Sequence, residues 1–273
     1  MKIIVEGLGI RFHKGVEALR DVSFQVAGGE LVTVVGPSGC GKSTMLNVIA
    51  SLIPPEEAEL GGRIQVDGVD VLPGGTRPAS LGYVFQRDSL FPWRTVIQNV
   101  ESGLEIRGIP KVERHQKARG WVDLVGLSGF EHYYPHQISG GMRQRTSLIR
   151  TLAYEPEVIL MDEPFGALDA QTRMILQGEL IRIWAASRKT ILFVTHDLAE
   201  AITLGERVIL FSKRPGTVTR IYDVPFPHPR DPIELRGSSE FAELHAFIWR
   251  TLSEEFREET LDGQGPAVQN SRT

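Results

Sequence analysis

The chain has 273 residues, of which 41% are hydrophobic, and a formal net charge of -4. A chain of this length can bury a substantial core, but its acidic balance excludes the broad basic surface with which proteins bind nucleic acid. No segment approaches the roughly 20 apolar residues of a membrane helix, and the single cysteine, Cys40, has no partner for an internal disulfide.

The first part of the chain is predicted to run as strand, loop and helix. Apolar positions after Lys42 recur at helical spacing. Thr95 with Gln98 three residues later indicates a capping box that opens another helix, and helical patterns then continue to Tyr154. The expected strands of this part lie at 22–26, 31–35, 63–66 and 81–85.

From Val158 onward, strands alternate with helices. Such alternation predicts parallel pairing in an α/β sheet that is covered on both faces. The helical stretch from about 87 to 157 is then a subdomain inserted into that sheet. Prolines between 225 and 232 indicate a stiff linker before a final helix. The expected strands are 158–161, 190–195 and 207–211, the helices run from about 172 to 186 and from 197, and the final helix has an apolar stripe at Phe241, Leu244, Ile248, Leu252 and Phe256.

The segment 36–44 matches the pattern G-x-x-x-x-G-K-[ST] between an expected strand and an expected helix. Glycines are needed because backbone N–H groups must close around phosphates without a Cβ in the way. Lys42 supplies a positive charge for the β and γ oxygens, and the Ser43 hydroxyl is a ligand for Mg²⁺. We therefore expect the whole loop to bind nucleotide: Gly36, Pro37, Ser38, Gly39, Cys40, Gly41, Lys42, Ser43 and Thr44.

Cys40 lies in this loop beside Lys42. A neighbouring cation and surrounding N–H groups favour a thiolate, so we expect a reactive thiol that bound nucleotide shields. The alternative is that Cys40 merely fills a position for a small residue and reacts slowly.

Two carboxylates, Asp162 and Glu163, follow the apolar run 158–161. They are expected at the carboxyl end of a buried strand, which is the edge where open α/β sheets bind ligands. Asp162 is assigned to Mg²⁺ and Glu163 to the attacking water. An acidic pair that starts a loop is the alternative for any Asp-Glu dipeptide taken alone. The phosphate-binding pattern upstream favours the functional interpretation.

With these motifs, the chain resembles the nucleotide-binding subunit of an ATP-binding cassette (ABC) transporter from about residue 3 to 223. Five further matches support the resemblance: Phe12 for the aromatic residue that stacks on adenine, Gln86 for the Q-loop, Ile138 to Met142 for the signature sequence, Ala167 to Asp169 for the D-loop, and His196 for the switch histidine. The resemblance implies a P-loop NTPase (RecA-like) core with a mainly parallel sheet, an inserted α-helical subdomain and an N-terminal antiparallel β region. It divides the chain into a nucleotide-binding domain at 1–223, with its helical subdomain at about 87–157, and a C-terminal part at 224–273 that contains the Pro-rich linker, the helix and a disordered tail.

The family also implies ATP and Mg²⁺ as cofactors and a head-to-tail homodimer of ATPase subunits. In that dimer Ser139, Gly140 and Gly141 cap the γ-phosphate held by the opposite subunit, and Asp169 joins the nucleotide contacts. Gln86 is expected to complete the Mg²⁺ ligands with Ser43 and Asp162. The catalytic assignments are Lys42, Gln86, Glu163 and His196, with His196 as a sensor of the γ-phosphate.

Phe91 and Trp93, shortly after Gln86, are aromatic residues in a connection between sheet and helices. They are expected either to line a groove for a short helix of a membrane subunit or to be ordinary core residues. The wording of the segment 90–96 is similar to importer ATPases of the nitrate, sulfonate and taurine group. This similarity implies a peripheral subunit on the cytoplasmic side of the inner membrane, with permease subunits as partners and a periplasmic or surface solute-binding protein as an indirect partner. No nucleic acid is expected as a partner, because the acidic chain lacks a broad basic surface.

The alternative function is a soluble or exporter-type ABC ATPase that is not coupled to uptake. Repair members of the family carry a long coiled coil between the phosphate loop and the signature, but the interval 44–138 has no heptad run. Translation members carry two cassettes in one chain, and this chain has one.

Overall fold

The computed structural model describes residues 1–71, 81–166 and 168–262, with side chains described as far as Ser253. The expected disordered tail, the side chain of Phe256 and Ala167 of the expected D-loop lie outside these descriptions. Across the described residues, no helix combines the length and the apolar character that crossing a bilayer requires.

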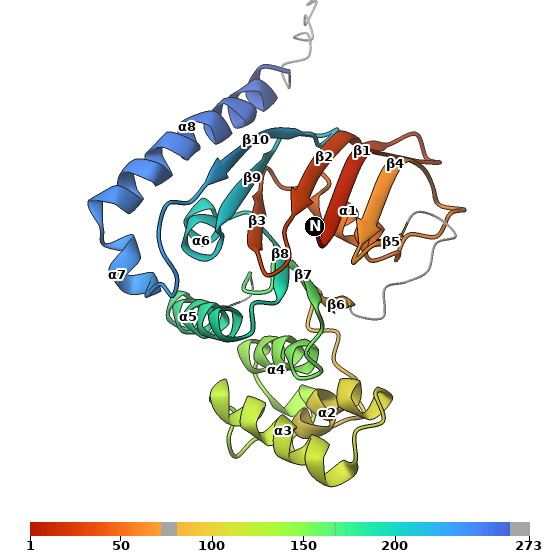
Figure 1. The fold of residues 1–273 in the computed structure, drawn as a ribbon, viewed down its shortest axis with the longest axis vertical. Coiled ribbons are helices and arrows are strands. Elements are labelled where there is room, and N and C mark those ends of the chain that lie inside the picture. Colours follow the sequence, from red (N-terminus) through yellow and green to blue (C-terminus); the bar gives the residue numbers. More distant parts are fainter. Residues whose placement is uncertain (72–80, 167, 263–273) are drawn as a thin grey trace, which may run out of the picture.

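The centre of the molecule is a six-stranded sheet in the order β10-β9-β3-β8-β7-β6 (Figure 1). Every neighbouring pair is parallel except β9 and β10, which pair antiparallel. Every residue of β3, β7 and β8 is buried, as expected for parallel strands covered on both faces. The strands are β3 (Leu31–Val35), β6 (Leu81–Val84), β7 (Val158–Asp162), β8 (Thr190–Thr195), β9 (Arg207–Phe211) and β10 (Val218–Asp223).

A second, antiparallel sheet in the order β2-β1-β4-β5 lies beside the first. Helix α1 (Lys42–Ile49) packs between the two sheets, because its apolar residues share one core cluster with both. The strands of this sheet are β1 (Ile3–Phe12), β2 (Glu17–Val26), β4 (Ala58–Val66) and β5 (Val69–Asp70).

Three α-helices and a short 3₁₀ turn form a separate group at one end of the molecule (Figure 1). The predicted capping box at Thr95 is confirmed: the Thr95 side chain accepts from the Gln98 backbone, and the Gln98 side chain accepts from the Thr95 backbone. These elements are α2 (Val96–Ile106), α3 (Lys111–Leu124), η1 (Pro135–Gln137) and α4 (Gly140–Leu152).

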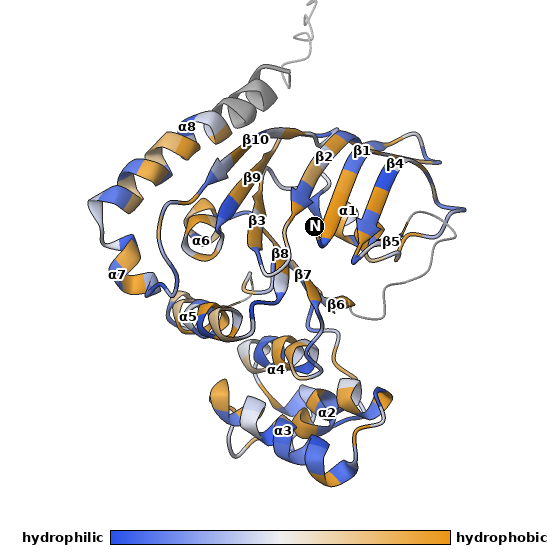
Figure 2. Cartoon of the chain, in the orientation of Figure 1, coloured by the Kyte–Doolittle hydropathy of each residue, from blue (hydrophilic) through white to orange (hydrophobic). Residues whose placement is uncertain are grey.

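The remaining helices lie on the face of the central sheet that is opposite to α1. Along α8, hydrophobic and hydrophilic segments alternate (Figure 2), and the predicted apolar stripe is buried at Phe241, Ile248 and Leu252. These residues share a core cluster with α6. The helices are α5 (Ala170–Ser187), α6 (Leu198–Leu204), α7 (Pro232–Arg236) and α8 (Ser239–Asp262).

The arrangement confirms the predicted fold class, with a mainly parallel sheet, inserted helices and an N-terminal antiparallel region. Strands β1, β5 and β10 had no counterpart among the individual strand predictions. Half of the β10 residues are exposed at an edge of the sheet, so its sequence lacks the continuous apolar run of a buried parallel strand.

Candidate functional site

The loop between β3 and α1 has the backbone shape that its glycines predict. Gly39 and Gly41 adopt φ values of 75° and 107°, which side chains other than glycine rarely tolerate. A Cβ on Gly41 would lie 2.8 Å from the carbonyl oxygen of Ala18, and one on Gly36 would lie 2.8 Å from that of Phe211. The loop can therefore keep this path only with glycine at these positions.

Lys42 is buried at the first turn of α1, with 5% of its surface exposed. Its Nζ donates to the carbonyl oxygens of Gly36 and Pro37, each at 2.8 Å. These contacts hold the ammonium group against the loop, at the helix end whose dipole favours anions. The loop thus combines a fixed positive charge with the N-terminus of a helix.

A cavity of about 330 Å³ opens next to this loop. Its volume is at the lower end of the range of small-molecule sites. It brings the loop together with the expected adenine-stacking residue Phe12, with Gln86 and with Glu163. The lining residues are Phe12, Val16, Ala18, Ser38, Gly39, Gly41, Lys42, Ser43, Thr44, Gln86, Glu163 and Arg214.

Two of the three expected Mg²⁺ ligands are in contact, because Ser43 Oγ donates to Asp162 Oδ1 at 2.9 Å. Burial raises the pKa of Asp162, and the negative charge of Glu163 adds to this, while the hydrogen bond from Ser43 lowers it. A buried carboxylate beside a hydroxyl offers the hard oxygen ligands that Mg²⁺ prefers, so these residues fit the ion. Gln86, the third expected ligand, instead donates to Glu163.

In the described part of the chain, no group of three or more His, Cys, Asp and Glu residues is placed to hold a metal ion. Proteins commonly hold Mg²⁺ through one or two side chains together with water and substrate phosphates.

Glu163 follows β7 with a φ of 44°, a left-handed conformation that is strained for a glutamate. The Glu163 backbone N–H donates to the carbonyl oxygen of Val194 at 2.9 Å. Oε2 of Glu163 accepts from Gln86 Nε2 at 3.1 Å and lies 3.1 Å from Nδ1 of His196. The structure therefore gathers three of the four predicted catalytic residues around one carboxylate.

Ser139 is the N-cap of α4, and its Oγ accepts from the backbone N–H of Met142 at 3.3 Å. Ser139 and Gly140 are exposed, and Gly141 is half-buried. Asp169 is the N-cap of α5, and its hydrogen bond from Thr172 lowers the pKa of the Asp169 carboxyl. None of these four predicted nucleotide contacts is among the described residues that line the cavity of the same chain.

The sequence interpretation missed Arg214 as a residue of the cavity. Its Nε and Nη2 donate to the carbonyl oxygen of Gly39 at 3.1 and 2.9 Å. In the same turn, a Cβ on Gly216 would lie 2.2 Å from the carbonyl oxygen of Cys40, so the turn lies directly against the phosphate loop. The only signal for it in the sequence was the Arg-Pro-Gly turn after the last predicted strand of the sheet.

The expected thiolate character of Cys40 is wrong. Cys40 is 1% exposed, and burial raises the pKa of its thiol although Lys42 Nζ lies 3.8 Å from its sulfur. Removing the thiol from water disfavours its charged form more than the lysine favours it. Cys40 fills a small buried position, as the alternative interpretation had it.

A groove of about 570 Å³ lies between β6, α2 and α4. Phe91 lines this groove, whereas Trp93 is 70% exposed, so the interpretation of Trp93 as a core residue is wrong. Arg150 lies over the Phe91 ring at 5.6 Å. The lining residues are Leu81, Tyr83, Phe85, Ser89, Phe91, Ser102, Gly103, Ile106, Arg107, Arg150, Thr151 and Tyr154.

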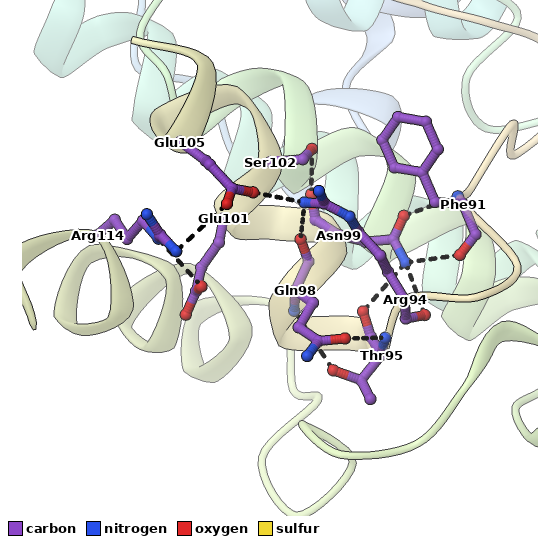
Figure 3. A network of polar contacts seen from close by, with 9 residues as sticks. All are labelled: Phe91, Arg94, Thr95, Gln98, Asn99, Glu101, Ser102, Glu105 and Arg114. Carbon is purple, nitrogen blue, oxygen red and sulfur yellow. Dashed lines mark hydrogen bonds and ion pairs between the residues drawn. The ribbon is translucent and has the colours of Figure 1, made fainter. Parts of the chain in front are cut away.

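The loop that carries Phe91 is held by Asn99 of α2 (Figure 3). Asn99 is fully buried, and its Oδ1 accepts from the Phe91 backbone at 2.8 Å. Its Nδ2 donates to the carbonyl oxygens of Phe91, Arg94 and Thr95 at 3.0 to 3.2 Å. The buried side chain of Asn99 therefore fixes the loop that forms this edge of the groove.

Comparisons with known proteins agree on one family for this chain. A family model described as ABC transporter matches residues 19–166. An uncharacterized ABC transporter ATP-binding protein of Methanocaldococcus jannaschii is 48% identical over 259 residues, covering 93% of this chain and 92% of its own. The aliphatic sulfonates import ATP-binding protein SsuB of Bacillus cereus is 41% identical, covering 89% of this chain and 93% of its own. The taurine import ATP-binding protein TauB of Yersinia pestis is 47% identical, covering 76% of this chain and 78% of its own.

Among solved structures, the ATP-binding cassette MJ0796 in a dimeric post-hydrolysis state bound to ADP and Pi aligns with a TM-score of 0.70. Its sequence is 30% identical, and the alignment covers 82% of this chain and 100% of the other.

Proposed function

The chain belongs to the ABC transporter family and is an ATPase subunit of that family, and from this premise we propose that it powers the uptake of a small solute through a separate permease. The solute class that we propose is nitrate, a sulfonate, taurine or a similar small anion or organic solute. The support is the likeness to SsuB and TauB, which are named as import ATP-binding proteins for aliphatic sulfonates and taurine.

The proposal of ATP hydrolysis rests on the Glu163 carboxylate, which lines the cavity of the phosphate loop and contacts both Gln86 and His196. We assign Glu163 to the attacking water, Lys42 to the charge on the β and γ oxygens, and His196 to the γ-phosphate. Ser43, Asp162 and Gln86 would hold Mg²⁺, which when bound neutralises charge on the phosphates. Before Glu163 can orient water, its contacts with Gln86 and His196 have to loosen.

We further propose that the catalytic unit is a head-to-tail homodimer. Ser139, Gly140 and Gly141 stand at the N-terminus of α4 and do not line the cavity of their own chain. A helix N-terminus that begins at two exposed residues, Ser139 and Gly140, suits a phosphate brought by a second copy. The related cassette MJ0796 is described as dimeric, which supports this arrangement.

A complementation experiment tests the composite site. Lys42→Ala removes the positive charge of the phosphate loop, and Ser139→Glu places a negative charge where the γ-phosphate of the opposite subunit would lie. Each variant alone is expected to hydrolyse ATP at least ~100-fold more slowly than the wild type. A mixture of the two is expected to recover activity, because each mixed dimer contains one site with an intact phosphate loop and an intact signature sequence. Mixed dimers without recovered activity would contradict the composite site.

The groove around Phe91 is our proposed docking site for a short helix of the permease, which would place the chain on the cytoplasmic face of the membrane. The binding protein that delivers solute would then contact only the permease. A Cβ on Gly103 would lie 2.3 Å from the Tyr154 ring, so Gly103→Leu is expected to obstruct the groove. Copurification with the co-expressed permease should be lost while the ATPase rate of the isolated chain stays within about twofold of wild type.

Gly120→Leu is the matched control, because a Cβ at Gly120 on α3 meets no atom within 4 Å. It should leave copurification unchanged. Retention of the permease by a folded Gly103→Leu variant would argue against this groove.

A further inference from the structure

Helix α6 begins two residues after His196 and has only seven residues, Leu198–Leu204. A helix this short is not stable by itself, so its place depends on what packs around it. Its Leu198, Ala201 and Ile202 share a core cluster with residues of α8. Figure 1 shows α7 and α8, in blue, running along the outer side of the molecule past α6.

The last turn of α6 is held by an arginine from the segment that precedes α7. Nη1 of Arg230 donates to the carbonyl oxygens of Ile202, Thr203 and Gly205 at 2.9, 3.2 and 3.0 Å. Arg230 is 7% exposed, and burial lowers the pKa of its guanidinium to about 10. A buried cation at the carbonyl end of a helix satisfies groups that the helix leaves without partners.

The first turn of α6 is reached by a chain of polar side chains that starts at the half-buried Arg236 on α7. Arg236 donates through Nε to Thr203 Oγ1 and through Nη2 to Gln177 Oε1, both at 3.0 Å. Nε2 of Gln177 donates to Oε1 of Glu200 at 2.8 Å. Gln177 is fully buried, and Glu200 is 4% exposed.

Glu200 in turn belongs to the cap of α6. Its backbone N–H donates to Oδ1 of Asp197 at 3.1 Å, and Asp197 directly follows His196 in the chain. Arg173 of α5 lies 3.6 Å from Asp197 and donates to the carbonyl oxygen of Leu168 in the expected D-loop. The polar chain from Arg236 therefore ends at the residue beside His196.

We propose that Arg236 is a positioning residue for His196, and that the segment 224–252 holds α6 where ATP hydrolysis requires it. The inference rests on the role proposed above for His196 at the γ-phosphate. Arg236 acts through Gln177 and Glu200, so its loss is expected to displace His196 without altering the phosphate loop. The effect should therefore fall on turnover and not on nucleotide binding.

The test is Arg236→Met in the full-length chain, because methionine keeps the apolar stem but removes both donors. We expect kcat for Mg-ATP to fall ~10-fold, since small displacements of catalytic groups cost this much or more. KM for ATP should stay within about twofold of wild type. Arg236→Lys retains one donor and should give an intermediate kcat. Arg250→Met, on an exposed position of α8, is the control and should match the wild type.

A second measurement separates positioning from a general loss of structure. In a His196→Ala background, Arg236→Met should lower the residual rate by less than about twofold, because residues that act on one step are not additive. An equal fall in both backgrounds, or a folded Arg236→Met with wild-type kcat, would overturn the inference. If Arg236→Met does not fold, Gln177→Met breaks the same chain of contacts at its next residue and is judged by the same criteria. An inactive wild type that binds no ATP would instead refute the proposed function.

Discussion

At the scale of single residues, Glu163 stands out because three features meet in it. It directly follows a buried strand, it has a strained backbone, and its carboxylate contacts both Gln86 and His196. Strained conformations persist where the surrounding structure imposes them, and they are common at functional sites. The hydrogen bond from its backbone to Val194 of the neighbouring strand provides that support.

Glu163→Gln is expected to bind Mg-ATP with unchanged affinity, because Lys42, Ser43 and Asp162 are left intact. Turnover should fall by ~100-fold or more, since an amide cannot take a proton from water. The dimer should then persist in Mg-ATP. Phosphate release and size-exclusion chromatography measure the two effects, and Glu243→Gln at an exposed position of α8 is the control. A wild-type rate of phosphate release would remove Glu163 from the mechanism.

Cys40 should react slowly with a maleimide both with and without Mg-ATP. The thiol is buried and its pKa is raised, so the thiolate becomes appreciable only at a pH above the ordinary range of a cysteine. Labelling rates of the native chain, of the chain with nucleotide and of the chain in denaturant would be compared. Native labelling as fast as that of the denatured chain would contradict the burial.

At the scale of elements, the edge of the groove depends on how α2 is capped and on what its first turn holds. The capping box of Thr95 and Gln98 starts the helix, and the next residue, Asn99, binds the loop that precedes it. Both features lie within one turn of the helix (Figure 3). The position of Phe91 is thus set by local hydrogen bonds.

Asn99→Ala is expected to lower the free energy of unfolding by about 1–3 kcal/mol, because buried backbone groups of the loop lose their partner. Urea denaturation with an unchanged m-value would measure this. Gln98→Ala, which removes the exposed half of the capping box, should cost about 1 kcal/mol or less. A smaller effect for Asn99→Ala than for Gln98→Ala would show that the loop is held by other contacts.

At the scale of the whole molecule, the segment after β10 packs back on α5 and α6. His228 in this segment meets the Trp184 ring of α5 edge-on, with the ring centroids 4.6 Å apart. Both ring nitrogens of His228 are buried without a hydrogen-bond partner among the described residues. Our division of the chain at residue 223 stays a prediction, but the segment beyond it is closely packed on the helices of the core.

Burial of His228, with the nearby charges of Arg230 and Arg188, lowers the pKa of its imidazole from 6.5 to about 4. The unfolded chain therefore binds more protons at this residue between these two values, so the free energy of unfolding should fall as the pH drops through that window. His228→Phe keeps a ring against Trp184 and should flatten this part of the profile. Thermal unfolding midpoints at several pH values measure it, with the exposed His136→Phe as the control. Equal slopes for wild type and His228→Phe would contradict the assignment.

Features of the site that depend on neighbouring residues in the chain could be predicted from the sequence. The phosphate loop, the buried strand followed by the acidic pair, the cap at Thr95 and the helix that starts near 197 were predictable, and the structure has each of them. Each depends on residues within a few positions of one another, where backbone geometry and hydrogen bonding act locally. The sequence alone therefore determined the parts of the site and the order in which they occur along the chain.

Only the tertiary structure decided how these parts meet. Gln86 and His196 reach Glu163 from 77 and 33 residues away, Arg214 reaches Gly39 from 175, and Arg236 reaches Gln177 from 59. Such contacts depend on the strand order, which places β3 between β9 and β8 and so brings the loops that follow these strands to one edge. The burial of Cys40 has the same origin, since its solvent is excluded by segments far from it in the chain. A local sequence pattern does not determine which distant segment packs against it, because that depends on the packing of the whole chain.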